Sequence, residues 1–471
     1  MPFSSYTFLI YILIISIGYL LVRSTKIEKV YLILVSAVFY LSAKYPSYLF
    51  ILMFYSLLNY VIGKNLLNFK SRKYITVLTV IINLLNLVLF KYIDSFTPFI
   101  TGNGSIKLDI VLPLGISFYT LKNIAYILDI YYERKECEKN FSNYLLFTLF
   151  FPTVSAGPIY RVKEFFSDRL PGKEVNFGKT NQSLQIIAIG LFFKIVIADN
   201  LSPYVSRIFD SGLQVTSLNA WISSFAYSLQ IYFDFNGYTY IAIGLSMLFG
   251  FKVPANFNKP FSAYSITDFW RKWHITLSLW LRDYIFLPLS FYLHRRLPNI
   301  KRKNKELLVY SLATTITFAV CGLWHGAGWN YLLWGGFYGL FMVIERATGI
   351  EKKFKKSKYS IIVKQVIVFV AVTLLWVLFR ADLPRAFQIY RYMFTFNNAG
   401  TDVLELLPQL TILVLLIITL TAQYGYLDFF KNIFNRENVY VKILYVVFIV
   451  LLYTSIIILK GESDTFIYFK F

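Results

Sequence analysis

The sequence predicts an all-α integral membrane protein that crosses the bilayer many times, and three observations support this class. Of its 471 residues, 57% are hydrophobic and 19% are aromatic, which exceeds the apolar share of a soluble domain. Several apolar runs are long enough, or nearly so, to cross a hydrocarbon core of about 30 Å as helices. The basic residues gather in short clusters between these runs, as expected of cytoplasmic loops.

The clearest predicted spans cover residues 7–22, 75–89, 361–379 and 439–459. The first is expected to be a retained span, because it lacks the charged start and the small-residue cleavage site of a signal peptide. Between residues 30 and 62, the tripeptide at 44–46, Lys-Tyr-Pro, interrupts an apolar run. Proline disfavours helix at the residue before it, so this stretch is predicted to form a helical hairpin.

Six basic clusters are predicted to face the cytoplasm, at 23–29, 64–73, 133–139, 161–169, 294–305 and 351–358. The apolar stretches between them then give roughly ten or eleven membrane segments. Lys431 and Arg436 precede the final span and the acidic segment 461–464 follows it, which places the last residues outside the cell. These loops account for the net charge of +22 without nucleic-acid binding. Because no internal repeat or linker is found, residues 1–471 are treated as one domain.

Residues 229–290 interleave charged and apolar positions. In a helix over residues 268–284, His274 shares an apolar side with two tryptophans, and Arg271 and Arg282 form an adjacent polar stripe. Such a helix either anchors the chain at the membrane interface or lines a polar cavity.

Asp234 lies in an apolar run of the same region. A carboxylate within a membrane is costly unless it is paired or faces water, and Arg271 or Arg282 is a candidate partner. We therefore hypothesise a water-filled cavity among these helices.

Residues 307–347 form a second predicted hairpin, because both flanks are strongly basic and must lie on the same side. Its turn, at 322–330, is rich in glycine and contains His325, and irregular backbone within a membrane must be buried in protein or line a cavity. A structural histidine bonded across helices is one reading. The functional reading is a general base that takes a proton from an attacking hydroxyl. His294, in a basic loop, is expected to be solvated.

Six sequence landmarks, in order along the chain, resemble the membrane-bound O-acyltransferase family, and specifically its bacterial branch that contains the alginate O-acetyltransferase membrane subunit. These are LPLGISFYT from Leu112, FPTVSAGPIYR from Phe151, QIYFDFNGY from Gln230, NFNKPFSAYSITDFWRKWHITLSLWLRDYIFLPL from Asn256, GLWHGAGWNYLLWG from Gly322 and FIYFKF from Phe466. The core landmarks lie within residues 112–345.

The resemblance implies a ring of transmembrane helices, with interfacial or re-entrant helices, around a central funnel. It places the family histidine, here His325, at the bottleneck, with His274 as its partner and Tyr468 as a plausible acyl carrier. Supporting residues from the same landmarks, or predicted beside them, are Asp234, Asn256, Arg271, Arg282, Trp324 and Asn330. Arg271, Arg282 or the backbone amides of 326–328 are candidate donors to the oxyanion.

The implied function is transfer of an acyl group, expected to be acetyl, from a cytoplasmic donor such as acetyl-CoA to an extracellular or cell-wall polysaccharide. No permanently bound cofactor and no metal is expected. The implied partner is a secreted or membrane-anchored acetyltransferase of the SGNH type, and the location is the bacterial cytoplasmic (inner) membrane. D-alanyl transfer to teichoic acid is the alternative within the same resemblance, since that protein shares the NFN and WH landmarks.

Two alternatives outside acyl transfer remain open. A polytopic transporter or flippase also buries polar residues, but it predicts paired broken helices in two halves, which the sequence does not contain. A noncatalytic scaffold for the partner enzyme predicts that His325 is dispensable. The P-loop, GxSxG and HxxxxD patterns are absent, and a thioester on Cys321 is disfavoured because this residue also suits a small apolar filler.

Overall fold

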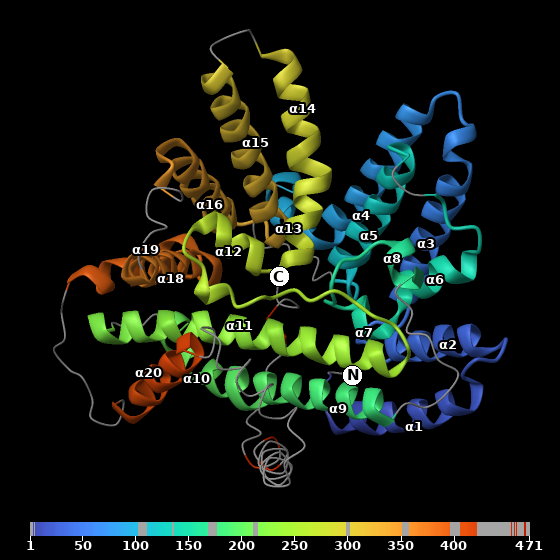
Figure 1. The fold of residues 1–471 in the computed structure, drawn as a ribbon, viewed down its shortest axis with the longest axis horizontal. Helices are drawn as coiled ribbons and strands as arrows, with labels where there is room; N and C mark the ends of the chain where they lie inside the picture. Colours follow the sequence, from blue (N-terminus) through green and yellow to red (C-terminus); the bar gives the residue numbers. More distant parts are fainter. Residues whose placement is uncertain are drawn as a thin grey trace. The chain divides into compact units, whose positions relative to one another are not determined.

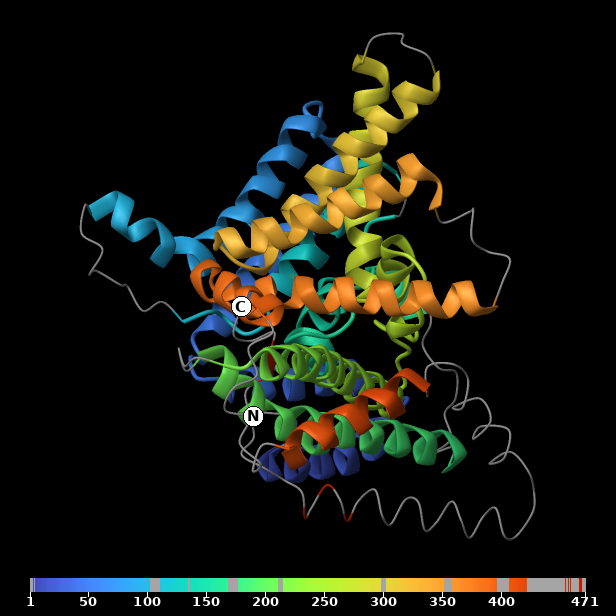
Figure 2. The ribbon, with the colours of Figure 1, turned by 90° about the vertical axis from the view of Figure 1, so that its left-hand side faces the viewer.

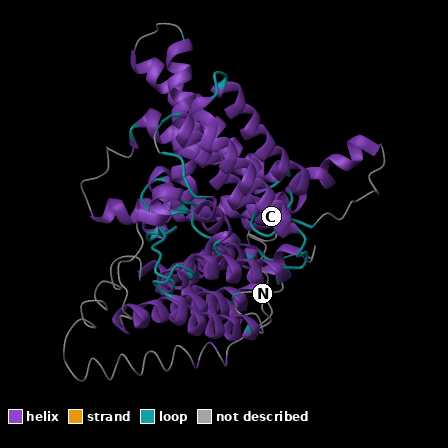
Figure 3. Ribbon diagram, turned by 90° about the vertical axis from the view of Figure 1, so that its right-hand side faces the viewer, coloured by secondary structure: helices purple, strands orange, loops and turns teal. Residues whose placement is uncertain are grey.

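The computed structural model describes residues 3, 5–101, 111–133, 136–167, 177–210, 215–297, 302–350, 358–395, 406–421, 454, 456, 458 and 466–467. In these residues the chain forms helices joined by loops, and no strand occurs among them (Figure 3). The all-α prediction is confirmed for this part of the chain. Two compact units interleave along the sequence: unit 1 holds residues 1–190 and 238–255, and unit 2 holds residues 191–237 and 256–471.

Unit 1 consists of short and long helices from the first part of the chain, together with residues 238–248 at the end of α11 (Ser217–Leu248) (Figure 1). They are α1 (Tyr6–Val22), α2 (Glu28–Leu41), α3 (Tyr48–Asn65), η1 (Leu66–Asn68), α4 (Arg72–Thr101), α5 (Ile116–Tyr131), α6 (Phe141–Leu149), α7 (Phe151–Val154), α8 (Val162–Ser167) and α9 (Phe177–Leu191), whose last residue belongs to unit 2.

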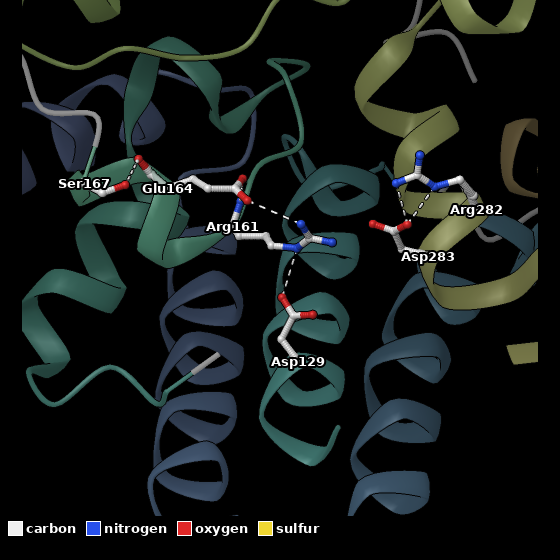
Figure 4. A network of polar contacts seen from close by, with 6 residues as sticks. All are labelled: Asp129, Arg161, Glu164, Ser167, Arg282 and Asp283. Carbon is white, nitrogen blue, oxygen red and sulfur yellow. Dashed lines mark hydrogen bonds and ion pairs between the residues drawn. The ribbon is translucent and has the colours of Figure 1, made fainter. Parts of the chain in front are cut away.

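Helix α5 forms the centre of unit 1. It contacts α3, α4 and α6, and nearly all its side chains are buried. Asp129 on this helix forms an ion pair of 3.1 Å with Arg161, which also reaches Glu164 on α8 (Figure 4). The buried carboxylate is therefore neutralised by a partner from a different segment, as a low-dielectric interior requires.

Unit 2 contains the remaining helices (Figure 1). They are the π-helical turn η2 (Phe192–Ala198), α10 (Asp199–Asp210), the first part of α11 (Ser217–Leu248), η3 (Pro260–Ser262), α12 (Ile266–Lys272), α13 (Ile275–Leu281), the π-helical turn η4 (Arg282–Phe286), α14 (Leu287–Arg296), α15 (Arg302–His325), α16 (Trp329–Thr348), α18 (Lys358–Arg380), α19 (Leu383–Thr395) and α20 (Leu406–Thr421).

Helices α15 and α16 form a closely packed hairpin in unit 2, and α16 also contacts α18 (Figure 2). Glycine permits this approach: a methyl group added at Gly335 would lie 2.1 Å from the carbonyl oxygen of Phe318. The hairpin predicted over 307–347 is confirmed, with its turn at 326–328. The interruption predicted within 30–62 is confirmed, because α2 ends at Leu41 and α3 begins at Tyr48, but α2 packs mainly on α6, and α3 on α5 and α6, rather than on each other.

Within the described residues, five helices are long and apolar enough to cross a membrane, at 48–68, 72–93, 178–210, 302–325 and 360–380. Two shorter apolar helices cover 6–22 and 410–419. The predicted spans at 75–89 and 361–379 fall within this set, and 7–22 within a shorter helix. Large apolar side chains such as Leu13 and Phe50 are more than half exposed, as expected where lipid is the solvent. Most of 439–459 lies outside the described residues, and the count of ten or eleven segments stays a prediction.

The single helix predicted over residues 268–284 is wrong. Helix α12 ends at Lys272, and α13 begins at Ile275. Between them His274 has φ 41° and ψ 52°, in the left-handed region. The periodicity of apolar residues continues across this break, which is why the sequence pattern did not reveal it.

Candidate active site around two buried histidines

His325 is the last residue of α15 and is almost completely buried. Three aromatic rings meet its imidazole edge to face, with centroid distances of 4.7 Å to Trp324, 5.2 Å to Trp334 and 4.9 Å to Phe379. These rings come from α15, α16 and α18. Aromatic packing on several sides fixes the orientation of the ring and limits the access of water.

The local sequence explains why α15 ends at this histidine. The next three residues are Gly326, Ala327 and Gly328, and the amide of Gly326 donates to the carbonyl of Gly322 over 3.3 Å. Helix α16 restarts at Trp329, where the amide of Tyr331 donates to Gly328. The imidazole therefore lies directly beside a short, glycine-rich turn, as the sequence predicted.

Asn330 ties this turn to the neighbouring helix. Its Nδ2 donates to the carbonyl of Leu378 on α18 over 3.1 Å. The next residue on α18, Phe379, is one of the rings that packs on His325. Asn330 thus supports the site by joining two of the helices that enclose the histidine.

His274 occupies the break between α12 and α13, and Asn256 holds the backbone there. The carbonyl of Asn256 accepts from the amide of Ile275 (2.9 Å), and its Oδ1 accepts from the hydroxyl of Thr276 (2.6 Å). The amide of Asn258 donates to the carbonyl of Lys272 (3.0 Å). A segment from before α12 therefore replaces the helical hydrogen bonds that the break removes.

The ring of His274 is buried beside Phe235 (centroid distance 4.6 Å) and Trp324 (6.3 Å). Burial lowers the pKa of His274 to about 3, so its imidazole is neutral at physiological pH. Trp324 packs on His274 as well as on His325. The two histidines predicted to act together thus share one aromatic neighbour.

Asp234, on α11, is buried and forms an ion pair of 2.7 Å with Lys194. Lys194 also pairs with Asp199 over 2.6 Å. The sequence analysis proposed Arg271 or Arg282 for this role, whereas Arg282 forms its ion pair with Asp283 over 2.8 Å (Figure 4). Lys194 had a signal in the sequence, because it is the only charged residue in the apolar run before Asp199.

Arg271 and Arg282 line a cavity of about 450 Å³ in unit 2. Its other walls are mostly apolar and include Trp270, Ile275 and Phe318. Neither His274 nor His325 is among the described residues that line it. The cavity that the two arginines line thus does not include either imidazole.

Tyr468 lies outside the described residues. The two residues before it are described and buried: the amide of Ile467 donates to Oδ2 of Asp234 over 2.8 Å, and Phe466 packs on Phe235 with a centroid distance of 5.9 Å. The first two residues of the terminal landmark are thus bound to α11, and one of them packs on Phe235, the residue that contacts His274.

Trp334 is a candidate site residue that the sequence analysis missed. It is 1% exposed, packs on His325, and its indole N–H has no hydrogen-bond partner among the described residues. Tryptophan usually hydrogen-bonds this group when it is buried. No group of three or more metal-ligating side chains occurs in the described part of the chain.

Comparison with known proteins decides the family. The sequence profile of the membrane-bound O-acyltransferase family, MBOAT, matches residues 138–381. A probable alginate O-acetylase of Pseudomonas aeruginosa is 33% identical over 453 residues, which cover 93% of this chain and 83% of the relative. The chain belongs to the membrane-bound O-acyltransferase family. It is therefore a multi-pass membrane protein and an O-acyltransferase.

Two further relatives of this MBOAT protein differ in their named reaction. A peptidoglycan O-acetyltransferase of Helicobacter pylori is 34% identical over 413 residues, covering 80% of this chain and 76% of the relative. A teichoic acid D-alanyltransferase of Bacillus subtilis is 32% identical over 248 residues, covering 52% of this chain and 61% of the relative. Both acetyl and D-alanyl transfer thus occur among the relatives.

Proposed function

We propose that this protein moves an acetyl group from a cytoplasmic donor, acetyl-CoA, across the bacterial inner membrane for O-acetylation of an extracellular or cell-wall polysaccharide. The single observation that carries the chemistry is the buried imidazole of His325 beside a glycine turn. The choice of acetyl is supported by the relatives, because those named for O-acetylation align with 80% or more of this chain and the D-alanyltransferase with about half.

In the proposed reaction, His325 acts as a general base. An acceptor hydroxyl attacks the thioester carbonyl while its proton passes to the imidazole, and a tetrahedral intermediate forms. The intermediate collapses, the C–S bond breaks, and the thiolate takes the proton back from the imidazolium. The products are an acetyl ester and the free thiol of coenzyme A. His274 supports His325 through the Trp324 ring that both contact.

The oxyanion needs a donor that is already in place. The amides of Ala327 and Gly328 remain candidates, because they lie in the turn beside His325. Arg271 and Arg282 are supported less, since they line a cavity that includes neither imidazole. Trp334 joins the candidates through its buried indole N–H, which lies on a ring in contact with His325.

The first acceptor in this proposal is Tyr468, and a partner enzyme of the SGNH type then passes the acetyl group to the polysaccharide. A phenol can act as a covalent nucleophile when a base assists it. The ring of helices with a central funnel gives donor and acceptor access from opposite sides. No permanently bound cofactor takes part.

Replacement of His325 by alanine tests the proposal. A general base contributes about 10²- to 10⁴-fold, so base-labile acetate on the extracellular glycan should fall by at least about a hundredfold. His325→Gln, which keeps a polar side chain, should also be inactive, and His294→Ala, at an exposed position, should retain activity. Purified variants should keep the wild-type unfolding midpoint.

Cells that carry the His325→Ala variant also distinguish acetyl transfer from the scaffold, the transporter and the D-alanyl alternatives. If His325→Ala retained glycan acetylation, both the general base and the acyl-transfer site would be wrong, and a scaffold or transporter would be favoured. If the variant lost base-labile D-alanine instead of acetate, the acyl group would be D-alanyl. Release of coenzyme A from acetyl-CoA by the purified protein would separate an enzyme from a transporter.

A further inference from the structure

A buried cluster of one lysine and two aspartates lies in unit 2. Lys194 Nζ is 2.6 Å from Oδ1 of Asp199 and 2.7 Å from Oδ1 of Asp234. The three side chains are 10%, 2% and 1% exposed, respectively. Charges in a low-dielectric interior are costly, so a cluster of this kind requires close partners for every charge.

The π-helical turn η2 explains how Lys194 and Asp199 meet. In an α-helix of 3.6 residues per turn, residues five apart point to different sides. Here the amide of Asp199 donates to the carbonyl of Lys194, which is the i to i+5 bond of a π turn. The wider turn brings the two side chains into line. π turns of this kind occur frequently at functional sites.

Asp234 has a second contact that links the cluster to a distant segment. Its Oδ2 accepts the backbone N–H of Ile467 over 2.8 Å, while Oδ1 faces Lys194. Hydrogen bonds to an ionised acceptor are about twice as strong as neutral ones. Lys194 therefore fixes the Asp234 carboxylate through the ion pair, and the carboxylate binds the backbone at residue 467 through the hydrogen bond.

The next residue on α11 connects this contact with the candidate active site. Phe235 packs on Phe466 with a centroid distance of 5.9 Å and on His274 with a centroid distance of 4.6 Å. Two consecutive residues of one helix thus contact the 466–467 segment by a hydrogen bond and by a ring. In the sequence, Tyr468 directly follows this segment.

We infer that Lys194, Asp199 and Asp234 form a clamp that binds the 466–467 segment and so positions the residue after it for acyl transfer. Asp234 is a positioning residue in this account, because it touches the segment and not the reacting atoms. The inference rests on the proposed function for the role of Tyr468, but the binding of the segment can be measured without any activity. The rival explanation is a cluster that only stabilises the helix bundle.

Thiol reactivity at residue 467 tests the clamp. In a full-length chain with Cys137→Ser and Cys321→Ala, Ile467→Cys keeps the backbone N–H and places a thiol at a buried position. Adding Asp234→Ala should raise its rate of reaction with a maleimide about tenfold or more, as loss of a charge-assisted hydrogen bond predicts. Asp234→Asn keeps an acceptor oxygen, so it should give a smaller increase.

Asp210→Asn is the matched control, because this carboxylate also forms an ion pair in unit 2, with Arg380 over 2.6 Å. It should leave the thiol rate unchanged. If the rate with Asp234→Ala equalled the rate with Asp234 present, the clamp would be overturned, whatever the activity. Equal increases with Asp234→Ala and Asp210→Asn would also overturn it, since general loosening would explain both.

A second pair of variants leaves the charged cluster intact. Ile467→Pro removes the N–H that Asp234 accepts, and Ile467→Ala removes most of the side chain and keeps the N–H. Glycan acetylation should fall about tenfold or more with proline and change little with alanine. Equal activity of the two would contradict a positioning role. His325→Ala should leave the thiol rate at wild type, so failure of the proposed chemistry and failure of the clamp give different results.

Discussion

His274 combines two features at the scale of one residue: a buried neutral imidazole and a left-handed backbone. For residues other than glycine this conformation costs roughly 1–2 kcal/mol, and it persists only where neighbouring contacts hold it. Asn256 provides these contacts after the residue, at Ile275 and Thr276, and Asn258 provides one before it, at Lys272. The backbone at His274 is thus set by two residues that precede α12 in the chain.

Replacing His274 by glycine or by alanine distinguishes the role of its backbone conformation from the role of its imidazole. Both His274→Gly and His274→Ala should lose acetyl transfer if His274 supports His325. Glycine adopts this conformation without steric cost, so His274→Gly should be about 1 kcal/mol more stable than His274→Ala in unfolding measurements. Equal stability would show that the backbone is not strained, and retained activity in either variant would remove His274 from the site.

Sequence reasoning proposed His325 because a histidine within an apolar hairpin is rare and costly, and it proposed His274 through the family resemblance. It could not foresee the break at His274, since the hydrogen bonds that create it come from Asn256 and the apolar spacing runs on without interruption. It also missed the Lys194 partner of Asp234: Lys194 stands out as a lone charge in an apolar run, but the two residues lie on different helices, and spacing within one helix cannot show which side chains of two helices meet.

At the scale of elements, the α15–α16 hairpin carries the site, and its close packing depends on glycine at specific positions. A methyl group at Gly335 would approach the Phe318 carbonyl oxygen to 2.1 Å, whereas one at the adjacent Gly336 would meet nothing within 4 Å. The sequence predicted this hairpin correctly, since glycines and basic flanks mark its turn and its ends. The pattern could not say which glycine faces the partner helix.

Gly335→Ala and Gly336→Ala form a matched pair. Gly335→Ala should lower the free energy of unfolding by about 1–3 kcal/mol, because the helices must move apart, and it should reduce activity by displacing Trp334 from His325. Gly336→Ala should be neutral or slightly stabilising, since alanine is the better helix former. A thermal unfolding series on the two purified variants checks this, and equal midpoints would contradict the packing described here.

At the scale of the whole molecule, the predicted orientation can be tested with the native cysteines. Cys137 lies in a basic cluster predicted to be cytoplasmic and is partly exposed, whereas Cys321 is buried in α15. An impermeant maleimide should therefore label Cys137 in inverted vesicles and not in intact cells. Cys321 should stay unlabelled in both preparations.

A cysteine introduced at position 463 should give the opposite labelling pattern to that of Cys137. Ser463 follows the final predicted span and the basic residues Lys431 and Arg436 precede that span, so an extracellular position is predicted and the Ser463→Cys variant should react in intact cells. Labelling of Cys137 from outside, or of the introduced thiol at position 463 only from inside, would reverse the orientation and with it the side from which the donor enters. The number of membrane segments follows from the same method applied to further loops.

The π turn at η2 has a consequence that reaches past Lys194. One extra residue in a helix rotates everything that follows by roughly 100° about the axis. Downstream on α10, Asp210 meets Arg380, and the carbonyl of Ile208 accepts from Arg385. Deleting one residue between 195 and 198 would leave Lys194 four positions from its aspartate partner on this helix, and residues at that spacing share a face of a regular α-helix. Inserting one more residue there would instead act as a phase error: it would separate Lys194 from Asp199 and turn the surface of α10 away from α18 and α19.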